Sequence, residues 1–360
     1  MKTNHKIIIL LTLCLMLSAC AHYESDASIF DEDDCFLYRY SLLDEDEQDI
    51  YESLYAAMQD QTSFVMLDSH NGTDIASAYT ALMGDHPEFF YVEKISIYGW
   101  GIFGFVRIHY NEENIAQIET VDALIESIVS GISASASDYQ KIKYVYDYVI
   151  EHTEYNEDAN NNQNVLSVLL EGESVCAGYA KTVQWLLNEM GIPCAYITGE
   201  AYHEDADSAS HAWNMVYTNG GYYYLDSTWG DSEATGGDLE NPFHTCYAYF
   251  LMSEEETENF YEPDQAIQES ASTYNFYTVN NMVVSEYNAY TVMNIMRTQV
   301  NWGWDVLEIK CTEDSFDEVY DKLFNQSAIF NLLSNIGIYT SNLYYKTIDG
   351  LYMIEIYLGS

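Results

Sequence analysis

Apolar residues recur every third or fourth position over several stretches of this chain, a spacing that places them on one face of an α-helix. Between these stretches, runs of β-branched and aromatic residues bounded by turn-forming residues predict strands. The expected helices cover residues 50–58, 75–83, 115–132, 138–149, 177–190 and 314–336. The expected strands cover residues 89–98, 102–110, 194–199, 212–218, 222–226, 338–347 and 351–358. Helices and strands mix along the whole chain, which predicts an α+β fold.

A two-residue turn fixes how two of the central strands pair. Asn219–Gly220 is a strong hairpin turn, and with these residues at its centre Trp213 faces Asp226 across the hairpin. Because side chains alternate along a strand, His211 and Asp226 lie on the same face as diagonal neighbours, with backbones roughly 7–8 Å apart. A slip of one residue would move them to opposite faces. The last two strands are expected to form a similar hairpin around Asp349–Gly350.

The N-terminus has the pattern of a targeting segment. Two lysines precede an apolar run of eleven positions over residues 7–17, which is too short to span a bilayer but suits a signal peptide. The following Leu17–Cys20 resembles the bacterial lipobox, which implies that Cys20 becomes the lipid-acylated first residue of the mature chain. The alternative is an ordinary signal peptide cleaved near Ala19 or Ala21. Either interpretation places the folded part outside the cytoplasm, and the first places it on the bacterial surface.

The charge of the chain excludes some classes of partner. Acidic residues number 58 against 12 basic ones, a formal net charge of −46. Nucleic acid and anionic lipid are recognised through basic patches, so binding to either is not expected. Contact with the membrane is therefore expected only through the lipid anchor. The 48% of hydrophobic residues is enough to form a sizeable core over 360 residues.

Seven cysteines divide into groups with different expected roles. Cys14 leaves with the leader and Cys20 carries the lipid, which leaves Cys35, Cys176, Cys194, Cys246 and Cys311. Five is an odd number, so at least one thiol stays outside any intramolecular disulfide. The last three lie within apolar and aromatic runs and are expected to be buried.

The sequence predicts neither a metal site nor a cofactor. The cysteines show no paired spacing of the kind that binds zinc. His203 is followed by Glu204, Asp205 and Asp207, but neighbouring loop residues rarely converge on one ion, so a metal site there is disfavoured.

Cys176 differs from the other cysteines because it stands where a helix is expected to begin. A thiol attacks an amide carbonyl usefully only as the thiolate. A helix N-terminus and a nearby imidazolium both favour the thiolate. The helix over residues 177–190 provides the first of these, and the hairpin that holds His211 beside Asp226 can provide the second.

Three blocks of sequence resemble the signature blocks of the transglutaminase-like superfamily. They are Cys176–Ala180 (CAGYA), His211–Asn214 (HAWN) and Asp226–Trp229 (DSTW), in an order and spacing that suit the family. The resemblance covers about residues 138 to 231, and three ordered blocks are a specific signal. It implies a papain-like α+β core, amide substrates and a thioester acyl-enzyme.

By position in these blocks, the resemblance implies that Cys176 is the nucleophile, His211 the base and Asp226 the group that orients the imidazole. The backbone N–H of Cys176 is the natural first donor of an oxyanion hole. The candidates for a second donor are Tyr155, Gln163 and Asn164. Each triad residue alone has a simpler interpretation, as a structural thiol, a packed histidine or a solvated carboxylate, but their joint order and register favour the triad.

Two functions from different classes follow. The first is acyl transfer from an amide substrate, with water or an amine as acceptor; hydrolysis by a peptidase or amidase is favoured over cross-linking, because no device for excluding water from the thioester is evident. The second is a catalytically silent surface module that binds cell-wall or host components.

The loops that flank the three blocks bear on the substrate. Residues 154–164, 200–210 and 231–240 are rich in Asp and Glu, and Lys181 is the only Lys or Arg between residues 144 and 296. This predicts substrates that bear amines, such as Lys-containing peptides or amino-bearing wall peptides. The alternative is that the rim only shares the acidity of the whole chain.

The domain organisation predicted from these features has five parts. They are a lipoprotein signal peptide (1–20), an acidic tether (21–34), an N-terminal α+β region (35–112), a transglutaminase-like catalytic domain (113–262) and a C-terminal α+β domain (263–360).

Overall fold

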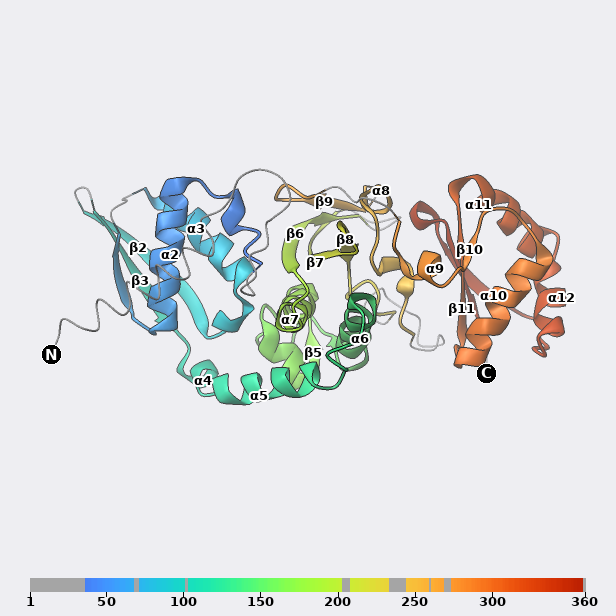
Figure 1. Cartoon of the computed structure of the whole chain (residues 1–360), viewed down its shortest axis with the longest axis horizontal. Coiled ribbons are helices and arrows are strands. Elements are labelled where there is room, and N and C mark those ends of the chain that lie inside the picture. Colours follow the sequence, from blue (N-terminus) through green and yellow to red (C-terminus); the bar gives the residue numbers. More distant parts are fainter. Residues whose placement is uncertain are drawn as a thin grey trace.

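The computed structural model describes residues 36–67, 71–100, 103–202, 208–232, 244–258, 260–268 and 273–358. Three groups of helices and strands follow one another in a row along the long axis of the molecule (Figure 1). The leader with Cys20, the acidic tether, Cys35 and the His203–Asp207 segment lie outside the described residues. In the part of the chain that is described, no helix has the length and hydropathy needed to cross a membrane.

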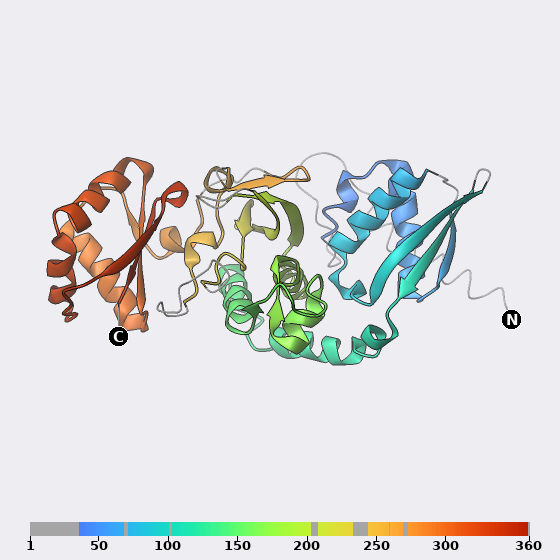
Figure 2. The same ribbon diagram turned by 180° about the vertical axis from the view of Figure 1, so that it is seen from behind.

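The N-terminal group places two helices on one face of a three-stranded sheet (Figure 2). Its elements are η1 (Tyr40–Leu42), α2 (Glu45–Gln59), β1 (Phe64–Leu67), α3 (Gly72–Asp85), η2 (Pro87–Phe89), β2 (Val92–Trp100) and β3 (Phe103–Tyr110). The antiparallel strand order is β1-β3-β2. Helix α2 begins with a capping box between Asp44 and Glu47, and its buried face includes Ile50, Leu54 and Met58 as the apolar spacing predicts.

The central group follows β3 in the sequence and precedes the C-terminal group. Its helices are α4 (Glu112–Ile115), α5 (Ile118–Val129), α6 (Asp138–Glu151), the π-helix η3 (Ser167–Glu171), α7 (Cys176–Glu189), η4 (Tyr247–Tyr249) and α8 (Glu254–Thr257). Its strands are β4 (Glu154–Tyr155), β5 (Glu173–Ser174), β6 (Cys194–Ala201), β7 (Ala209–Thr218), β8 (Gly221–Leu225) and β9 (Tyr261–Pro263). The main sheet is antiparallel with the order β8-β7-β6-β9. Helix α7 packs against β6 and β7, which brings its N-terminus to the sheet.

The hairpin register predicted from Asn219–Gly220 is confirmed. Tyr217 pairs with Tyr222 and Asn214 with Leu225, and both turn residues have positive φ angles of 52° and 77°. The single helix predicted over residues 115–132 is wrong in detail, because the helix breaks between α4 and α5.

The C-terminal group is a four-stranded sheet flanked by helices. Its elements are α9 (Phe276–Val279), β10 (Val283–Val284), α10 (Ala289–Trp302), β11 (Val306–Cys311), α11 (Glu313–Tyr320), the π-helix η5 (Asp321–Asn325), α12 (Ala328–Asn335), β12 (Tyr344–Ile348), η6 (Asp349–Leu351) and β13 (Met353–Tyr357). The strand order is β10-β11-β13-β12. The predicted hairpin around Asp349–Gly350 is confirmed, since Ile348 pairs with Met353.

Specific contacts join neighbouring groups. Arg39 donates to the Tyr196 carbonyl and the Thr198 hydroxyl of β6 at 3.1 and 3.2 Å, and the buried Gln184 amide of α7 donates to the Gly84 carbonyl at 2.8 Å. At the other side, the Tyr247 ring stacks on Phe276 with a centroid distance of 4.1 Å. The central group is therefore packed against both of its neighbours.

Candidate active site

Cys176 is the first residue of α7, as the sequence predicts within one residue. The preceding Val175 is extended and provides no side-chain cap, so the first turn of the helix directs free N–H groups toward the thiol end. Cys176 is half-buried, whereas the next four residues of the helix are buried. The thiol therefore combines a helix N-terminus with access from solvent.

The glycine of the first block is required by close packing. A Cβ at Gly178 would lie 2.0 Å from Ser174 Oγ and 2.7 Å from Ser167 Oγ. These two hydroxyls lie 2.7 Å apart and are buried. The loop that precedes Cys176 thus packs directly on the first turn of α7, which fixes the position of the thiol.

His211 and Asp226 meet as the hairpin register predicts. His211 lies in β7 and Asp226 follows β8; the Nε2 and Oδ2 atoms are 2.7 Å apart, with side-chain exposures of 8% and 0%. The imidazole lies in an aromatic cage, nearly parallel to the rings of Trp213, Trp229 and Tyr261 at centroid distances of 6.1, 5.2 and 6.2 Å. The ring orientation is therefore fixed by packing as well as by the carboxylate.

The carboxylate of Asp226 has hydrogen-bond donors on both oxygens. Besides His211, the Tyr261 hydroxyl donates to Oδ2 at 2.8 Å. The backbone N–H groups of Thr228 and Trp229 donate to Oδ1 at 2.9 and 3.0 Å. A buried carboxylate with this number of donors is well compensated for the loss of water.

Tyr261 was missed by sequence reasoning. It belongs to β9, which joins the sheet by pairing with β6 and brings Tyr261 opposite Ala201. It is separated from Asp226 by 35 positions, and no local spacing signals the contact. Only the strand order of the folded sheet could have identified it.

The electrostatics of the site favour a protonated imidazole. Burial alone would lower the pKa of His211, but the charge of Asp226, the hydrogen bond to Asp226 and a hydrogen bond to Cys176 outweigh burial and raise the pKa to about 10. The imidazole therefore interacts with the Cys176 thiol as well as with Asp226. The structure brings all three predicted triad residues together.

The three candidates for a second oxyanion donor lie in different settings. Gln163 is exposed, and the Asn164 side-chain oxygen accepts from the Leu166 N–H at 3.0 Å as part of a local turn. Tyr155 lies in β4, and burial together with the charge at Cys176 raises the pKa of its hydroxyl. Of the three candidates, Tyr155 is the one whose hydroxyl interacts electrostatically with Cys176.

The acidic rim predicted around the site is only partly described by the structure. Glu154, Glu157 and Asp158 are exposed, which agrees with a negatively charged rim. Asp231 is a correction: it is fully buried and accepts a hydrogen bond from the Tyr179 hydroxyl at 2.8 Å, so it belongs to the interior. The acidic residues within 203–207 and 233–243 lie outside the described residues.

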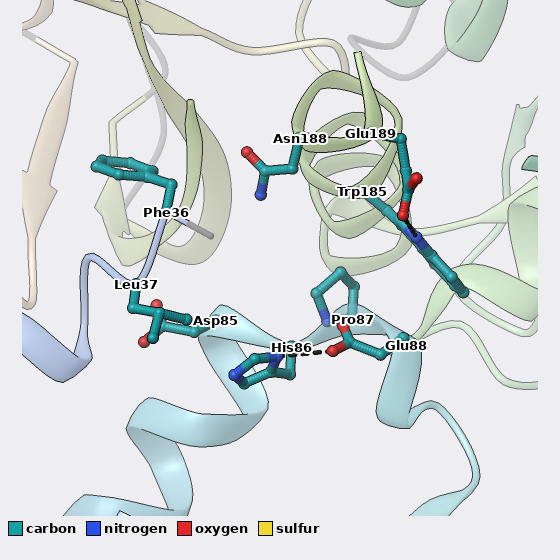
Figure 3. Close-up of a pocket in the computed structure, with 9 residues that line it drawn as sticks. All are labelled: Phe36, Leu37, Asp85, His86, Pro87, Glu88, Trp185, Asn188 and Glu189. Carbon is teal, nitrogen blue, oxygen red and sulfur yellow. Dashed lines mark hydrogen bonds and ion pairs between the residues drawn. The ribbon is translucent and has the colours of Figure 1, made fainter. Parts of the chain in front are cut away.

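A separate pocket is lined in part by Trp185, Asn188 and Glu189 of α7 (Figure 3), at the end of the helix opposite to Cys176. It has a volume of about 270 Å³ and is lined by residues that include Asp85–Glu88, Trp185 and Asn188. The rise of an α-helix places Asn188 about 18 Å from Cys176 along the axis. The Asp85 carboxylate in its wall accepts bonds from the N–H groups of Arg39 and Tyr40 at 3.0 and 2.9 Å, and burial raises its pKa to about 6.

The remaining described cysteines are buried, as predicted. Cys194, Cys246 and Cys311 are 0–3% exposed and form no disulfide. Cys176 is thus the accessible thiol among the described cysteines.

Comparison with known proteins identifies similar sequences over the central part of the chain. Residues 123–227 match the family model described as the transglutaminase-like superfamily. Kyphoscoliosis peptidase of Mus musculus is 24% identical over 134 residues, which is 33% of this chain and 20% of that protein; the protein of the same name from Homo sapiens is 24% identical over 130 residues, or 32% and 19%. The chain thus spans about a fifth of the length of these curated relatives.

Among solved structures, a transglutaminase covers 38% of this chain and 44% of its own at 17% identity, with a TM-score of 0.26. A structure described as a candidate cysteine protease from Cytophaga hutchinsonii covers 38% and 61% at 16% identity, with a TM-score of 0.27.

Proposed function

We propose that the transglutaminase-like domain of this chain is a cysteine-dependent enzyme that hydrolyses amide bonds through a thioester on Cys176. The observation that carries the proposal is that His211 interacts both with a helix-start thiol and, through Nε2 at 2.7 Å, with a buried carboxylate. This arrangement contains a nucleophile, a base and a group that orients the base, which are the parts that thiol-based acyl transfer requires.

The reaction proceeds in two halves. His211 has taken up the proton of the Cys176 thiol before the attack, and the thiolate attacks the amide carbon to form a tetrahedral intermediate whose oxyanion accepts a hydrogen bond from the Cys176 N–H. The imidazolium then donates its proton to the leaving amine, and the thioester remains. In the second half His211 takes a proton from water, the hydroxide attacks the thioester, and the carboxylic acid leaves as the thiol regains a proton.

Asp226 determines how His211 works. With Nε2 bound to Oδ2, the other ring nitrogen is left to face the thiol. The negative charge of Asp226 raises the pKa of His211 against the effect of burial, which strengthens the imidazole as a proton acceptor. Because Asp226 is itself held by Tyr261 and two backbone N–H groups, we expect little reorganisation of the carboxylate during the reaction.

The exposure of Cys176 supports hydrolysis over cross-linking. Cys176 is half-buried at the start of α7, so water should reach a thioester formed there. Aminolysis in water requires that the amine compete with a solvent at far higher concentration, which favours enzymes that shield the thioester. The exposed acidic residues of the rim, Glu154, Glu157 and Asp158, support the further proposal that amine-bearing peptides are preferred.

The location of the enzyme is part of the proposal and rests on the leader sequence. A lipid on Cys20 would hold the catalytic domain at the outer face of the membrane, at the end of the acidic tether. Intact mass spectrometry of the protein from its native membrane tests this, since a mature chain that begins at residue 21 or later and carries no lipid would contradict it.

Incubation of the protein with a peptide mixture, with and without an added amine, tests the activity. Mass spectrometry should show new peptide termini in water and few amine adducts, and matched Lys and Glu peptides at low salt should differ in rate with Lys favoured. The control is Cys176→Ala, which should yield neither product. Cleavage that persists in this variant, or a protein that only binds peptides without altering them, would contradict the proposal.

A further inference from the structure

A second cysteine-containing cluster lies where the central group meets the C-terminal sheet. His244 and Cys246 precede η4, Glu308 lies in β11 and Glu355 lies in β13. One ligand atom from each of these four side chains lies within 4.8 Å of all the others. Imidazole nitrogen, thiol sulfur and carboxylate oxygen are the donor atoms that transition metals use in proteins.

The two glutamates are placed where two negative charges are unfavourable. Glu308 and Glu355 are direct partners across the antiparallel β11–β13 ladder, and both are fully buried. Like charges directly opposite one another destabilise a sheet, and burial makes each charge more costly. The nearby cation is Lys346, whose Nζ lies 3.0 Å from Glu355 Oε2, which gives one positive charge to two carboxylates.

Each of the two carboxylates has one oxygen that accepts a hydrogen bond from a tyrosine. The Tyr277 hydroxyl donates to Glu308 Oε2 at 2.7 Å, and the Tyr357 hydroxyl donates to Glu355 Oε2 at 2.8 Å. Of the other two oxygens, Glu308 Oε1 accepts from the Tyr247 N–H at 3.2 Å and Glu355 Oε1 accepts from the Cys246 thiol at 3.1 Å. Hydrogen bonds to the far side of ligating carboxylates are typical of protein metal sites, because they fix the ligand orientation.

His244 provides an independent indication of a ligand. Both of its ring nitrogens are buried, and neither makes a hydrogen bond within the described residues. Nε2 lies 3.6 Å from Glu355 Oε1, which is within ion-pair distance but beyond hydrogen-bonding distance. A buried imidazole whose nitrogens make no hydrogen bond loses its hydrogen bonds to water without replacement, unless another group binds the ring.

We propose that His244, Cys246, Glu308 and Glu355 form a structural zinc site. Four ligands with one nitrogen, one sulfur and two oxygens suit tetrahedral Zn²⁺, in which neighbouring ligand atoms lie about 3.5 Å apart. The four ligand atoms lie within 4.8 Å of one another, with distances of 3.1 and 3.6 Å to Glu355 Oε1, so zinc binding draws the wider pairs together. Zinc binding releases the Cys246 thiol proton to solvent, and the metal with Lys346 balances one thiolate and two carboxylates.

A metal at this site would join the C-terminal sheet to the segment that carries Asp226. The Cys246 N–H donates to the Gly230 carbonyl at 2.8 Å, and the Asp226 N–H donates to the Tyr249 carbonyl at 3.0 Å. The segment that carries two zinc ligands therefore pairs with the segment that carries the orienting carboxylate. A metal at this junction stabilises the fold without contact with the substrate.

Zinc content and thermal unfolding of the full chain test the proposal. The protein is stripped with a chelator, loaded with zinc chloride and desalted, and we expect about one zinc ion per chain, with a melting temperature above that of the stripped protein. His244→Ala is the most informative variant, because its ring nitrogens make no hydrogen bond among the described residues, so the fold should survive. This variant and Cys246→Ala should lose the zinc and the thermal gain.

Two matched controls separate this site from other thiols. Cys311→Ala removes a buried thiol outside the cluster and Cys176→Ala removes the proposed nucleophile; both should retain the zinc. Cobalt in place of zinc should give a thiolate charge-transfer band that Cys246→Ala abolishes and Cys311→Ala keeps. The proposal is overturned if the loaded protein holds no zinc, if His244→Ala and Cys246→Ala keep it, or if Cys176→Ala loses it.

Discussion

Asp226 and the Glu308–Glu355 pair are both fully buried carboxylates beside a cysteine and a histidine, but they have different partners. Asp226 accepts from an imidazole, a tyrosine hydroxyl and two backbone N–H groups. Glu308 and Glu355 face each other across a strand pair, next to a histidine whose ring nitrogens make no hydrogen bond among the described residues. The Asp226 cluster has the partners that proton transfer requires, whereas the second cluster has ligand atoms that suit a cation.

The two clusters are also close enough to share a structural element. The Tyr146 hydroxyl donates to the Cys246 carbonyl at 2.8 Å and lies 3.5 Å from the Asp226 carbonyl. A Cβ at Gly230 would lie 1.8 Å from this hydroxyl, so the glycine after the Asp226–Trp229 block is needed for the contact. The comparison thus concerns two sites with different chemistry on one framework.

Removal of each thiol in turn gives the largest expected difference between the two clusters. Cys176→Ala removes the nucleophile and should lower peptide hydrolysis by at least roughly 1,000-fold, whereas Cys246→Ala should lower it by less than about ten-fold. The reason is that the Cys246 thiol contacts Glu355 and not His211. Steady-state rates on variants with native circular dichroism measure this, and equal losses would show that the clusters do not act separately.

Removal of the orienting charge should have the next largest effect. Asp226→Asn should lower kcat by about 100- to 10,000-fold, because the imidazole loses its partner and its preferred tautomer. The charge of Asp226 contributes to raising the pKa of His211 to about 10. The wild-type rate should therefore fall as pH rises through about 10, when the imidazolium loses the proton needed by the leaving amine.

In Asp226→Asn this alkaline fall should move to lower pH, because the pKa of His211 is no longer raised by the carboxylate. Profiles of kcat/KM against pH for both proteins provide the measurement. If the rates of the two proteins fall at the same alkaline pH, the charge of Asp226 does not raise the pKa of His211.

Asp85 is a further buried carboxyl, and the effect of burial on its pKa exceeds that of its hydrogen-bond partners. Burial raises the pKa of Asp85 from 3.8 to about 6, so the folded protein binds this proton more tightly than the unfolded chain. The stabilisation is fully present below about pH 4 and is lost as pH rises through about 6, a change of about 3 kcal/mol. The difference in unfolding free energy between wild type and Asp85→Asn should fall by this amount from pH 4 to pH 7 in urea titrations, and a constant difference would refute it.

Tyr261→Phe should have the smallest effect on the active site. It removes one hydrogen bond to Asp226 and keeps the ring that packs beside His211. The loss of a bond to a charged acceptor is worth about 1.5 kcal/mol, so kcat should fall by about ten-fold. Because the group acts through Asp226, the alkaline limb of the pH profile should also shift, and a stability loss with no such shift would mean that Tyr261 is only structural.

Local signals in the sequence predicted where the three proposed triad residues lie. The Asn219–Gly220 turn fixes the register that places His211 near Asp226, and the apolar spacing of residues 177–190 fixes the helix that begins at Cys176. Both signals act over short distances along the chain, so neighbouring residues carry them. The match of residues 123–227 to the transglutaminase-like superfamily agrees with what these blocks predicted.

Features that depend on distant strands could not be predicted in this way. Tyr261 reaches Asp226 only because β9 pairs with β6, and Glu308 faces Glu355 only because β13 lies beside β11. The short strand β1 (Phe64–Leu67) consists of four apolar residues in a row, so its sequence shows no alternation of apolar and polar positions. Asp231 looked like a surface acid, but the hydroxyl of Tyr179, far along the chain, accounts for its burial.

The reaction rate of the Cys176 thiol with iodoacetamide tests the central claim most directly. At mildly acidic pH, wild-type Cys176 should be alkylated at least roughly 100-fold faster than in His211→Ala, because the imidazole takes up the thiol proton. Peptide mapping assigns the label, and the buried Cys194 and Cys311 serve as internal references. A Cys176 that reacts no faster in the wild type than in His211→Ala would contradict the proposed mechanism.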